Sequence, residues 1–344
     1  MDFKRPVSFD DLLLIPQYSD INSRSDVSLA MKLPLVDHTF TLPLISASMD
    51  TVTGADMAAA MSNMGGLGII HRYMSIEEQV EEVRSAFSSG AVVVGAAIGV
   101  DDDFYDRADR LLSVDKRVIL SIDIAHGHHI KMMHALAALK NGCARDRHVM
   151  AGNIATREAY EDLVDWGADS VKCGIGGGSI CTTRIKTGHG VPTLQSIFEC
   201  AAAGLDVPVI ADGGFKESGD IVKGLAAGAN FVMLGSMLSG TEECPGEIVS
   251  VNGHKYKEYR GMASRKAQLK WRGRSAAPEG VVSTVLYKGS VYDILLDVKG
   301  QLKSGVSLSG AATIDELVLK AQWIEQTTAT RNESSAHIYN KTPK

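Results

Sequence analysis

The chain has 344 residues, of which 45% are hydrophobic and 22% are charged, and its formal net charge at pH 7 is −6. The negative charge argues against a partner nucleic acid or an acidic membrane surface, because both favour a basic protein surface. No apolar run reaches the roughly 18 residues that a membrane-spanning helix needs. The first residues lack the apolar core of a signal peptide, and the five cysteines include no CxxC pair, so we expect a cytoplasmic protein with reduced cysteines.

Short runs of apolar and β-branched residues recur eight times along the chain, and segments of helical periodicity follow seven of them. The runs are Leu42–Ser48, Leu67–His71, Val92–Ile98, Val118–Asp123, His148–Gly152, Ser170–Cys173, Val207–Ala211 and Phe231–Gly235. Two of the helical segments are Ile76–Ser88 and Thr156–Trp166. Eight buried strands that alternate with helices predict a parallel (β/α)8 TIM barrel, with an open doubly wound sheet as the alternative.

Two longer segments interrupt this rhythm, one after the sixth run and one after the eighth. The second is an insertion over about 238–312, before a last helix expected near Thr313–Thr327. Within it, Asn252-Gly253 separates two β-rich stretches and predicts a hairpin. The polar, basic stretch over 264–280 is interpreted as a mobile flap.

The whole chain, residues 1–344, is expected to form one catalytic domain. Residues 1–41 are interpreted as an N-terminal extension, and residues 331–344 as a loose tail. No internal repeat appears beyond the alternation of strands and helices.

Small turns at the ends of the seventh and eighth runs predict a phosphate site. The seventh run is followed by Asp212-Gly213-Gly214 and the eighth ends at Gly235-Ser236. TIM barrels often bind phosphate after their last two strands, where backbone amides are exposed. Ser179, in the loop after the sixth run, adds a hydroxyl donor. We therefore expect a small phosphorylated ligand.

The loop after the sixth run reads Gly174-Ile175-Gly176-Gly177-Gly178-Ser179-Ile180-Cys181-Thr182-Thr183-Arg184. Its spacing is not GxGxxG, so it does not predict a Rossmann nucleotide loop. The glycines allow backbone carbonyls to turn toward a monovalent cation, and the loop projects Cys181. A thiolate is a strong nucleophile, so Cys181 is the candidate nucleophile. Cys173, inside the sixth run, is expected to be a buried structural cysteine.

Polar residues also end the fourth and fifth runs. Asp123 ends the fourth, where a carboxylate can accept hydrogen bonds from ligand amides or hydroxyls. The histidines at 126, 128 and 129 follow it, but no acidic or cysteine residue at ligand spacing supports a metal site. Asn153 follows the fifth run.

The loop at residues 174–184 resembles the signature loop of the IMP dehydrogenase and GMP reductase superfamily. Further matches occur in the same order over most of the chain. They are Ser8–Leu12, Asn22–Ser25, Ser46–Thr51, Ile70–Arg72, Asp123–His128, Ala151–Asn153, Ala211–Gly214, Val232–Ser236, Tyr259–Met262 and Glu279-Gly280. The resemblance implies a TIM barrel, a purine 5′-monophosphate substrate, a nicotinamide cofactor and a homotetramer.

Within this superfamily the chain resembles GMP reductases more than IMP dehydrogenases. Dehydrogenases usually carry a CBS domain pair after the second strand, and the sequence leaves no room for it between His71 and Ile76. They also need a long flap with an Arg-Tyr pair that activates water, whereas this flap reads Trp271-Arg272-Gly273-Arg274. Tyr259–Met262 and Glu333–Ser335 are similar to dehydrogenases. An IMP dehydrogenase without CBS domains and a catalytically silent nucleotide-binding barrel are the alternatives.

The resemblance implies reductive deamination of GMP to IMP with NADPH, and it assigns catalysis to Cys181, Thr183 and Glu279. The implied substrate-binding residues are Ser179, Asp212, Gly213, Gly214, Gly235, Ser236, Gly261, Met262, Ala263 and Gly280. The implied cofactor-binding residues are Ser23, Arg24, Arg72, Asp123, Ile124, Ala125, Ile175 and Gly176. The implied potassium ligands are carbonyls of Gly176, Gly178, Cys181 and Arg184, with Glu333 of the partner subunit.

Overall fold

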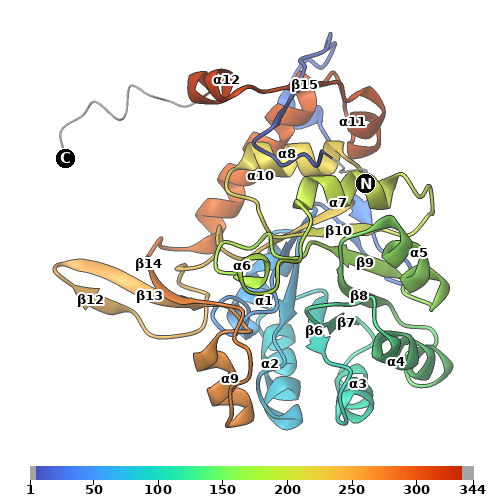
Figure 1. The fold of residues 1–344 in the computed structure, drawn as a ribbon, viewed down its shortest axis with the longest axis vertical. Helices are drawn as coiled ribbons and strands as arrows, with labels where there is room; N and C mark the ends of the chain where they lie inside the picture. Colours follow the sequence, from blue (N-terminus) through green and yellow to red (C-terminus); the bar gives the residue numbers. More distant parts are fainter. Residues whose placement is uncertain (1–4, 335–344) are drawn as a thin grey trace.

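The computed structural model describes residues 5–334. A closed barrel of eight parallel strands forms its centre (Figure 1), so the predicted TIM barrel is confirmed and the open sheet is excluded. The strands are β4 (Leu44–Ser46), β5 (Leu67–Ile70), β6 (Val94–Ile98), β7 (Val118–Asp123), β8 (Val149–Ile154), β9 (Ser170–Cys173), β10 (Val209–Asp212) and β11 (Phe231–Leu234). Each end of each strand lies within two residues of the end of a predicted run.

Helices with one apolar face cover the outside of the barrel. They are α1 (Ala55–Asn63), α2 (Ile76–Ser88), α3 (Phe104–Leu112), α4 (Ile130–Asn141), α5 (Arg157–Asp165), α7 (Thr193–Ala201), α8 (Ser218–Ala226) and α10 (Val291–Leu308). The bounds of α2 are those predicted, because Ser75 and Glu78 form a capping box at its start and Val80 and Val83 are buried. These helices fix the strands whose carboxyl ends carry the polar residues.

A short hairpin closes the amino end of the barrel. It consists of β2 (Met31–Lys32) and β3 (Thr39–Phe40). Phe40 belongs to the apolar cluster inside the barrel, and its ring meets that of Phe231 edge-on at 5.3 Å. The last part of the predicted N-terminal extension therefore packs into the amino end of the barrel, which leaves the opposite end free for a ligand.

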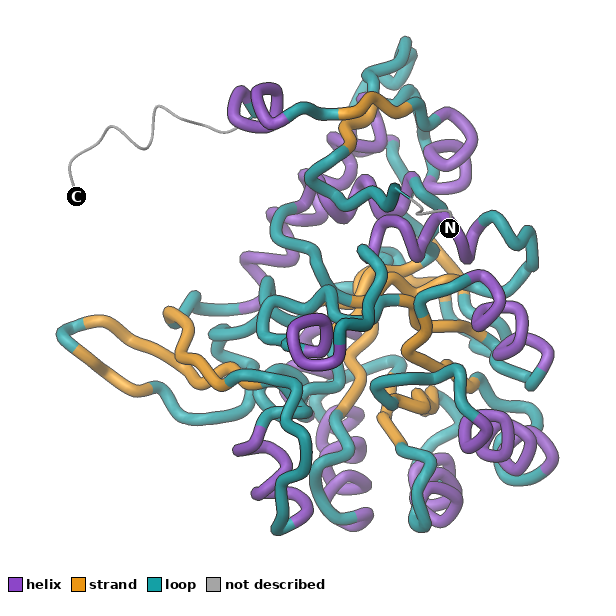
Figure 2. The backbone as a smooth tube through the Cα atoms, viewed as in Figure 1, coloured by secondary structure: helices purple, strands orange, loops and turns teal. Residues whose placement is uncertain are grey.

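The insertion after β11 contains the predicted hairpin, β12 (Val249–Val251) and β13 (His254–Arg260), and a third strand, β14 (Val282–Leu286). This small sheet projects away from the barrel (Figure 2). The helix α9 (Arg265–Arg272) lies within the predicted flap. The prediction that the insertion continues to residue 312 is wrong, because α10 is a barrel helix that buries apolar residues every three or four positions and packs on α8.

The end of the described chain also differs from its prediction. The helix expected near Thr313–Thr327 is limited to α11 (Ile314–Lys320). The chain then extends into β15 (Trp323–Glu325), which pairs antiparallel with β1 (Leu12–Leu14), and continues into α12 (Thr328–Glu333). Pairing with β1 favours a strand where the local sequence suggested a helix. The predicted loose tail begins within α12, and its residues 335–344 lie outside the described part of the chain.

None of the described helices is both long and apolar enough to cross a lipid bilayer.

Candidate active site

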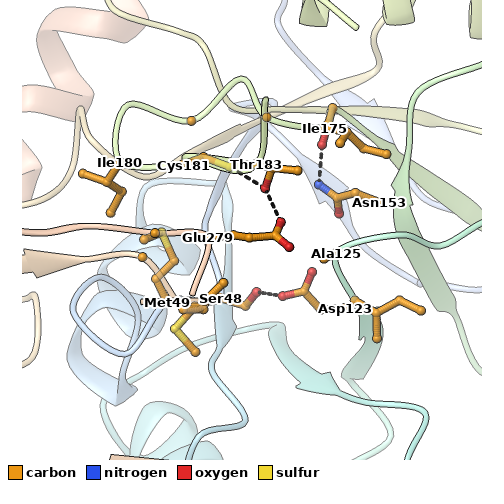
Figure 3. A pocket seen from close by; sticks show the side chains of 18 of the residues that line it. Ser48, Met49, Asp123, Ala125, Asn153, Ile175, Ile180, Cys181, Thr183 and Glu279 are labelled. Carbon is orange, nitrogen blue, oxygen red and sulfur yellow. Dashed lines mark hydrogen bonds between the residues drawn. The ribbon is translucent and has the colours of Figure 1, made fainter. Parts of the chain in front are cut away.

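A cleft with a volume of about 290 Å³ lies where the loops from the carboxyl ends of the barrel strands meet (Figure 3). Most of the predicted functional residues line it. They are Arg72, Asp123, Ile124, Ala125, Ile175, Gly176, Gly178, Cys181, Thr183, Gly261, Met262, Ala263, Glu279 and Gly280. Residues far apart in the sequence therefore converge on one cavity, as expected for a TIM barrel.

A chain of hydrogen bonds links the cysteine to a carboxylate within this cleft. The Cys181 thiol donates to the Thr183 hydroxyl, with Sγ and Oγ1 3.2 Å apart. The Thr183 hydroxyl donates to Glu279, with Oγ1 and Oε2 2.8 Å apart (Figure 3). A proton can move along such a chain from a nucleophile to a carboxylate, so the arrangement suits covalent catalysis with acid–base support.

Backbone hydrogen bonds hold Glu279 beside the loop that follows β9. The Thr182 amide donates to the Glu279 carbonyl at 2.8 Å, and the Val281 amide donates to the Ile180 carbonyl at 3.1 Å. The Glu279 amide in turn donates to the Ala263 carbonyl at 3.0 Å. The cysteine loop, the end of the flap and the segment after β13 thus form one continuous layer, which fixes the geometry of the cleft.

A small hollow adjoins the cleft and contains all the residues predicted to bind phosphate. Its predicted members are Ser179, Asp212, Gly213, Gly214, Gly235 and Ser236. Gly213 and Gly214 have φ angles of +83° and +89°, which side-chain-bearing residues rarely adopt. A Cβ atom on Gly213 would lie 3.1 Å from the Gly178 amide nitrogen. The turn after β10 therefore needs glycine, and together with the turn at Gly235-Ser236 it lines a hollow in which backbone amides can surround a small anion.

Tyr259, from the end of β13, lines both the cleft and this hollow. Burial raises the pKa of Tyr259 to about 12, although a hydrogen bond with Ser179 opposes the shift. The phenol therefore keeps its proton at neutral pH and can donate a hydrogen bond to an anion. Tyr259 is a site residue without a predicted role, although it belongs to the Tyr259–Met262 motif.

Two carboxylates lie at opposite sides of the site. Asp123 accepts hydrogen bonds from Ser48 Oγ at 2.6 Å and from Lys172 Nζ at 2.5 Å (Figure 3 shows the first). Asp212 accepts one from Asn153 Nδ2 at 2.6 Å. Burial alone would raise the pKa of Asp123, but Lys172 and Ser48 outweigh it and lower the pKa. Burial raises the pKa of Asp212, against the opposing charge of Lys172 and the hydrogen bond from Asn153.

A second hollow continues outward from the cleft. The two share the lining residues Arg72, Tyr73, Ile124, Ala125 and Ala263. Farther out, Lys131 and Arg272 supply cationic groups, and both form ion pairs with Asp101, at 3.2 and 3.7 Å. The two cavities together form an elongated groove with positive charge at its outer end, which suits an extended ligand that carries phosphate groups.

The flap helix α9 is docked against the barrel by an aromatic contact. The ring of Trp271 stacks on that of Tyr73, with centroids 5.7 Å apart and planes inclined by 12°. The guanidinium of Arg107 lies 5.7 Å from the Trp271 ring, and Arg107 is buried and hydrogen-bonded to Gln79. The structure shows the flap helix in this docked conformation, so the predicted mobility of the flap stays a prediction.

Two predicted cofactor residues, Ser23 and Arg24, are not among the residues that line the cleft. They lie at the short 3₁₀ helix η1 (Arg24–Asp26), which packs against α10. The extension that carries them runs along the outside of the barrel, so this chain alone does not bring them to the site.

The predicted potassium ligands form a donor set that is only partly consistent with the structure. Neutral carbonyl oxygens suit a monovalent cation. The Gly178 carbonyl, however, already accepts the Cys181 amide at 3.1 Å. Arg184 turns its guanidinium to the loop, where it donates to the carbonyls of Ile175 at 3.3 Å and Val191 at 2.6 Å. Potassium binding therefore stays a prediction.

The histidines after β7 have local partners. His128 Nε2 lies 2.7 Å from an oxygen of Asp162, and the His129 side chain accepts the Lys131 amide at the start of α4. Within residues 5–334, no group of three or more His, Cys, Asp or Glu side chains could hold a metal ion. Cys173 is fully buried, as predicted.

A family model described as "IMP dehydrogenase / GMP reductase domain" matches residues 6–337. The chain belongs to the IMP dehydrogenase and GMP reductase family. Among curated members, an inosine-5′-monophosphate dehydrogenase of Cryptosporidium parvum is 38% identical, over 96% of this chain and 94% of the relative. One from Nitrosopumilus maritimus is 33% identical, over 98% of this chain and 99% of the relative. That alignment spans 474 positions, more than the 344 residues here, so the relative has residues without counterparts in this chain.

Among solved structures of the family, a GMP reductase from Trypanosoma brucei in complex with guanosine 5′-monophosphate superposes with a TM-score of 0.92. It is 30% identical in sequence, and the match covers 97% of this chain and 98% of that one. This family member is therefore an oxidoreductase that acts on purine nucleotides.

Proposed function

We propose that this enzyme is a GMP reductase, which converts GMP, NADPH and two protons to IMP, NADP⁺ and ammonium. The observation that carries the proposal is the flap between Ser264 and Glu279. It has no Arg-Tyr pair, and its helix α9 places Trp271 against Tyr73 beside the cleft. A dehydrogenase must supply an activated water to the bound purine, whereas a reductase must keep water away from it.

In the first half of the reaction, Cys181 attacks carbon 2 of the purine. The thiol proton passes through Thr183 to Glu279, along the two hydrogen bonds of 3.2 and 2.8 Å. Glu279 then returns a proton to the exocyclic amine, because an amide anion is too poor a leaving group. Ammonia departs and a thioimidate between the sulfur and carbon 2 remains.

In the second half, the C–S bond breaks and IMP is released. NADPH, when bound, supplies the hydride that replaces the lost amine at carbon 2. The protein positions the cofactor and excludes water, and Asp123, Ile124, Ala125, Ile175 and Gly176 all line the cleft that contains Cys181. Arg72, Lys131 and Arg272 provide the cationic surroundings that a dinucleotide needs.

The nucleotide would lie between the small hollow and the cysteine. We assign its phosphate to Ser179, Gly213, Gly214, Gly235 and Ser236, with Tyr259 as a further donor. We assign its ribose to Asp212 and its base to Gly261, Met262, Ala263 and Gly280. From the glycine turns of the hollow to Cys181, the site would then hold the phosphate first, the ribose next and the base last, which is their order in a nucleotide.

The second candidate function is that of an IMP dehydrogenase. The names of the similar curated proteins favour it, as does Arg260, which forms a buried ion pair with Asp50 and belongs to the dehydrogenase-like motif. Both reactions pass through a purine bonded to Cys181, and they differ in whether hydride or water captures it.

Two parallel assays test the proposal. Purified enzyme is incubated with GMP and NADPH, with NADPH oxidation and ammonia followed together, and separately with IMP and NAD⁺, with XMP followed. We expect turnover in the first assay, with one ammonia for each NADPH, and none in the second. Turnover in the second alone would show a dehydrogenase, and binding of GMP without turnover in either would show a silent nucleotide-binding barrel. A homotetramer, measured by light scattering, is expected for either enzyme.

A Cys181→Ala variant is the control for these assays. It is expected to bind GMP with an affinity within a few-fold of the parent and to oxidise no NADPH, because only the nucleophile is removed. Cys143→Ala, which changes a half-buried cysteine outside the cleft, should retain activity. Repeating the assay with sodium in place of potassium tests the predicted cation.

A further inference from the structure

Lys172 is a buried, charged residue that has no role in the proposed reaction steps. It lies in the middle of β9 and its side chain is 0% exposed, yet the strand is otherwise apolar at its buried positions apart from Ser170. An isolated ammonium group in a protein interior is unfavourable, so its partners must explain its presence. Its ammonium group forms an ion pair with Asp123, and its charge also acts on Asp212.

The register of the barrel strands shows how the lysine reaches Asp123. Asp123 on β7 pairs with Gly152 on β8, and Gly152 pairs with Lys172 on β9. A Cβ atom on Gly152 would lie only 2.5 Å from the Cβ of Lys172. The glycine therefore leaves room for the lysine chain beside β8, and Nζ comes to 2.5 Å from Asp123 Oδ1, one strand further on.

The same lysine also faces the nucleotide side of the site. Lys172 pairs with Ile210 on β10, and Asp212 lies two residues farther along that strand, on the same face of it. The positive charge of Lys172 acts on both carboxylates, opposing the rise in pKa that burial causes at Asp212. One ammonium group thus serves two acids that belong to different subsites.

The Asp123 carboxylate is held from behind and open in front. Lys172 and Ser48 each bind one of its oxygens, and 28% of the side chain is exposed toward the cleft that it lines. The other charged groups that act on it are Arg72, which follows β5, and Asp212 on β10. The exposed part of an ionised carboxylate is an acceptor for a ligand N–H or O–H group, and a protonated one is a weaker acceptor.

We propose that Lys172 is a positioning residue of the active site, which binds the Asp123 carboxylate from behind and aims it at the cofactor, and which places a positive charge on the same barrel face as Asp212. The inference rests on the proposed function for the identity of the two ligands. Lys172 would contact neither the cofactor nor the nucleotide, and it would act on them through Asp123 and Asp212.

The test is the pH dependence of kcat/KM for the cofactor in a Lys172→Met variant. Without the lysine, burial raises the pKa of Asp123, so protonation removes the acceptor at a higher pH. We expect the acid limb of the profile to move upward by roughly 1–3 pH units. Loss of the contact that aims the carboxylate should in addition lower kcat/KM on the plateau above the limb. Lys172→Arg keeps the positive charge, so its acid limb should lie between those of the parent and the Lys172→Met variant. A folded Lys172→Met variant whose acid limb coincides with that of the parent overturns the proposal.

Lys257→Met is the matched control for loss of a buried lysine. Lys257 is 3% exposed, but its ammonium group binds only backbone carbonyls, of Thr241, Glu242 and Cys244, in the insertion. Its removal should lower thermal stability and leave the acid limb in place. If the limb moves equally in this variant, the effect is one of stability and the proposal is wrong.

Asp123→Asn keeps the test decisive if Lys172→Met does not fold. It removes the titrating group and keeps its shape, so the contribution of Asp123 to the acid limb should be lost; a profile that coincides with that of the parent overturns the proposal. The profile is measured on whichever pair the parent enzyme turns over, GMP with NADPH or IMP with NAD⁺, with equilibrium binding of the same cofactor as a second readout. An IMP dehydrogenase would thus refute the proposed function and still leave the role of Lys172 open to this measurement.

Discussion

Thr183 and Glu279 are separated by 96 positions in the chain and joined by a hydrogen bond of 2.8 Å in the structure. The pairing of residues 180–182 with residues 279–281 produces this contact, because it places the end of the flap directly beside the cysteine loop. The Glu279 carboxylate therefore belongs to a segment that also carries the flap helix. Chemistry at the cysteine and the position of the flap are structurally linked.

Removing either end of this hydrogen bond should slow ammonia release. Thr183→Ala and Glu279→Gln are each expected to lower turnover of GMP by roughly 10²–10⁴-fold, the usual contribution of a positioned acid or base. The rate of ammonia production with GMP and NADPH measures the effect. Thr183→Ser keeps the hydroxyl and should retain most of the activity; equal losses in the serine and alanine variants would contradict the relay.

Tyr259→Phe should weaken binding of the phosphate. Because burial raises the pKa of this phenol to about 12, it is a hydrogen-bond donor at neutral pH, and a bond to a charged group contributes about 1.5–3 kcal/mol. The dissociation constant of GMP is therefore expected to rise roughly 10- to 100-fold. Guanosine, which lacks the phosphate, is the control: if its affinity falls by the same factor, the tyrosine does not act on the phosphate.

Trp271→Ala should allow water into the site. The substitution removes the stack on Tyr73 and the contact with Arg107 that dock α9 beside the cleft. Water can then capture the purine bonded to Cys181, so we expect XMP to appear among the products of the reaction of GMP with NADPH, and ammonia to exceed the NADPH oxidised. Chromatography of the nucleotides measures the ratio of XMP to IMP. Leu269→Ala, on the exposed side of the same helix, should produce IMP alone; absence of XMP from the Trp271 variant would argue against this role.

Acid should destabilise the fold through His71, which is 8% exposed. Burial lowers the pKa of His71 to about 4, from 6.5, although Asp50 opposes the shift. Between these two values the unfolded chain binds a proton that the folded chain does not, so the free energy of unfolding falls as the pH falls. The loss reaches about 3 kcal/mol below pH 4.

The variant that isolates this effect is His71→Asn, whose side-chain oxygen can replace Nδ1 as the acceptor for the Tyr73 amide. Urea denaturation at several pH values between 4 and 7 should give a flatter dependence for the variant than for the parent. His148, also buried with a lowered pKa, is present in both and cancels in the comparison. Identical slopes would show that His71 does not contribute.

Local sequence patterns predict the barrel well because each strand and its helix form a local unit. The glycine turns of the small hollow are likewise predictable, since strand ends in this fold share one face. The long helix α10 falls within the segment predicted as an insertion, although its buried residues repeat at helical spacing; they are Val291, Leu295, Val298, Leu302 and Val306. Its pattern could have been found.

Other features depend on contacts between distant segments. The pairing of β1 with β15 joins three-residue strands more than 300 positions apart, which no local pattern reveals. The stack of Trp271 on Tyr73 has the same origin. Lys172 does leave a local signal, a single cation within a buried apolar strand, but its relation to Asp123 and Asp212 becomes apparent only when four strands, β7 to β10, are placed side by side.

The clearance at Gly152 makes two positions of the barrel depend on each other. An alanine there would meet the Cβ of Lys172 at 2.5 Å, a separation that packed atoms do not tolerate. A lysine at position 172 therefore fits only where position 152, on the neighbouring strand, is glycine. A related chain with a larger residue at position 152 would have no room for a lysine at position 172. We therefore expect positions 152 and 172 to change together in related chains.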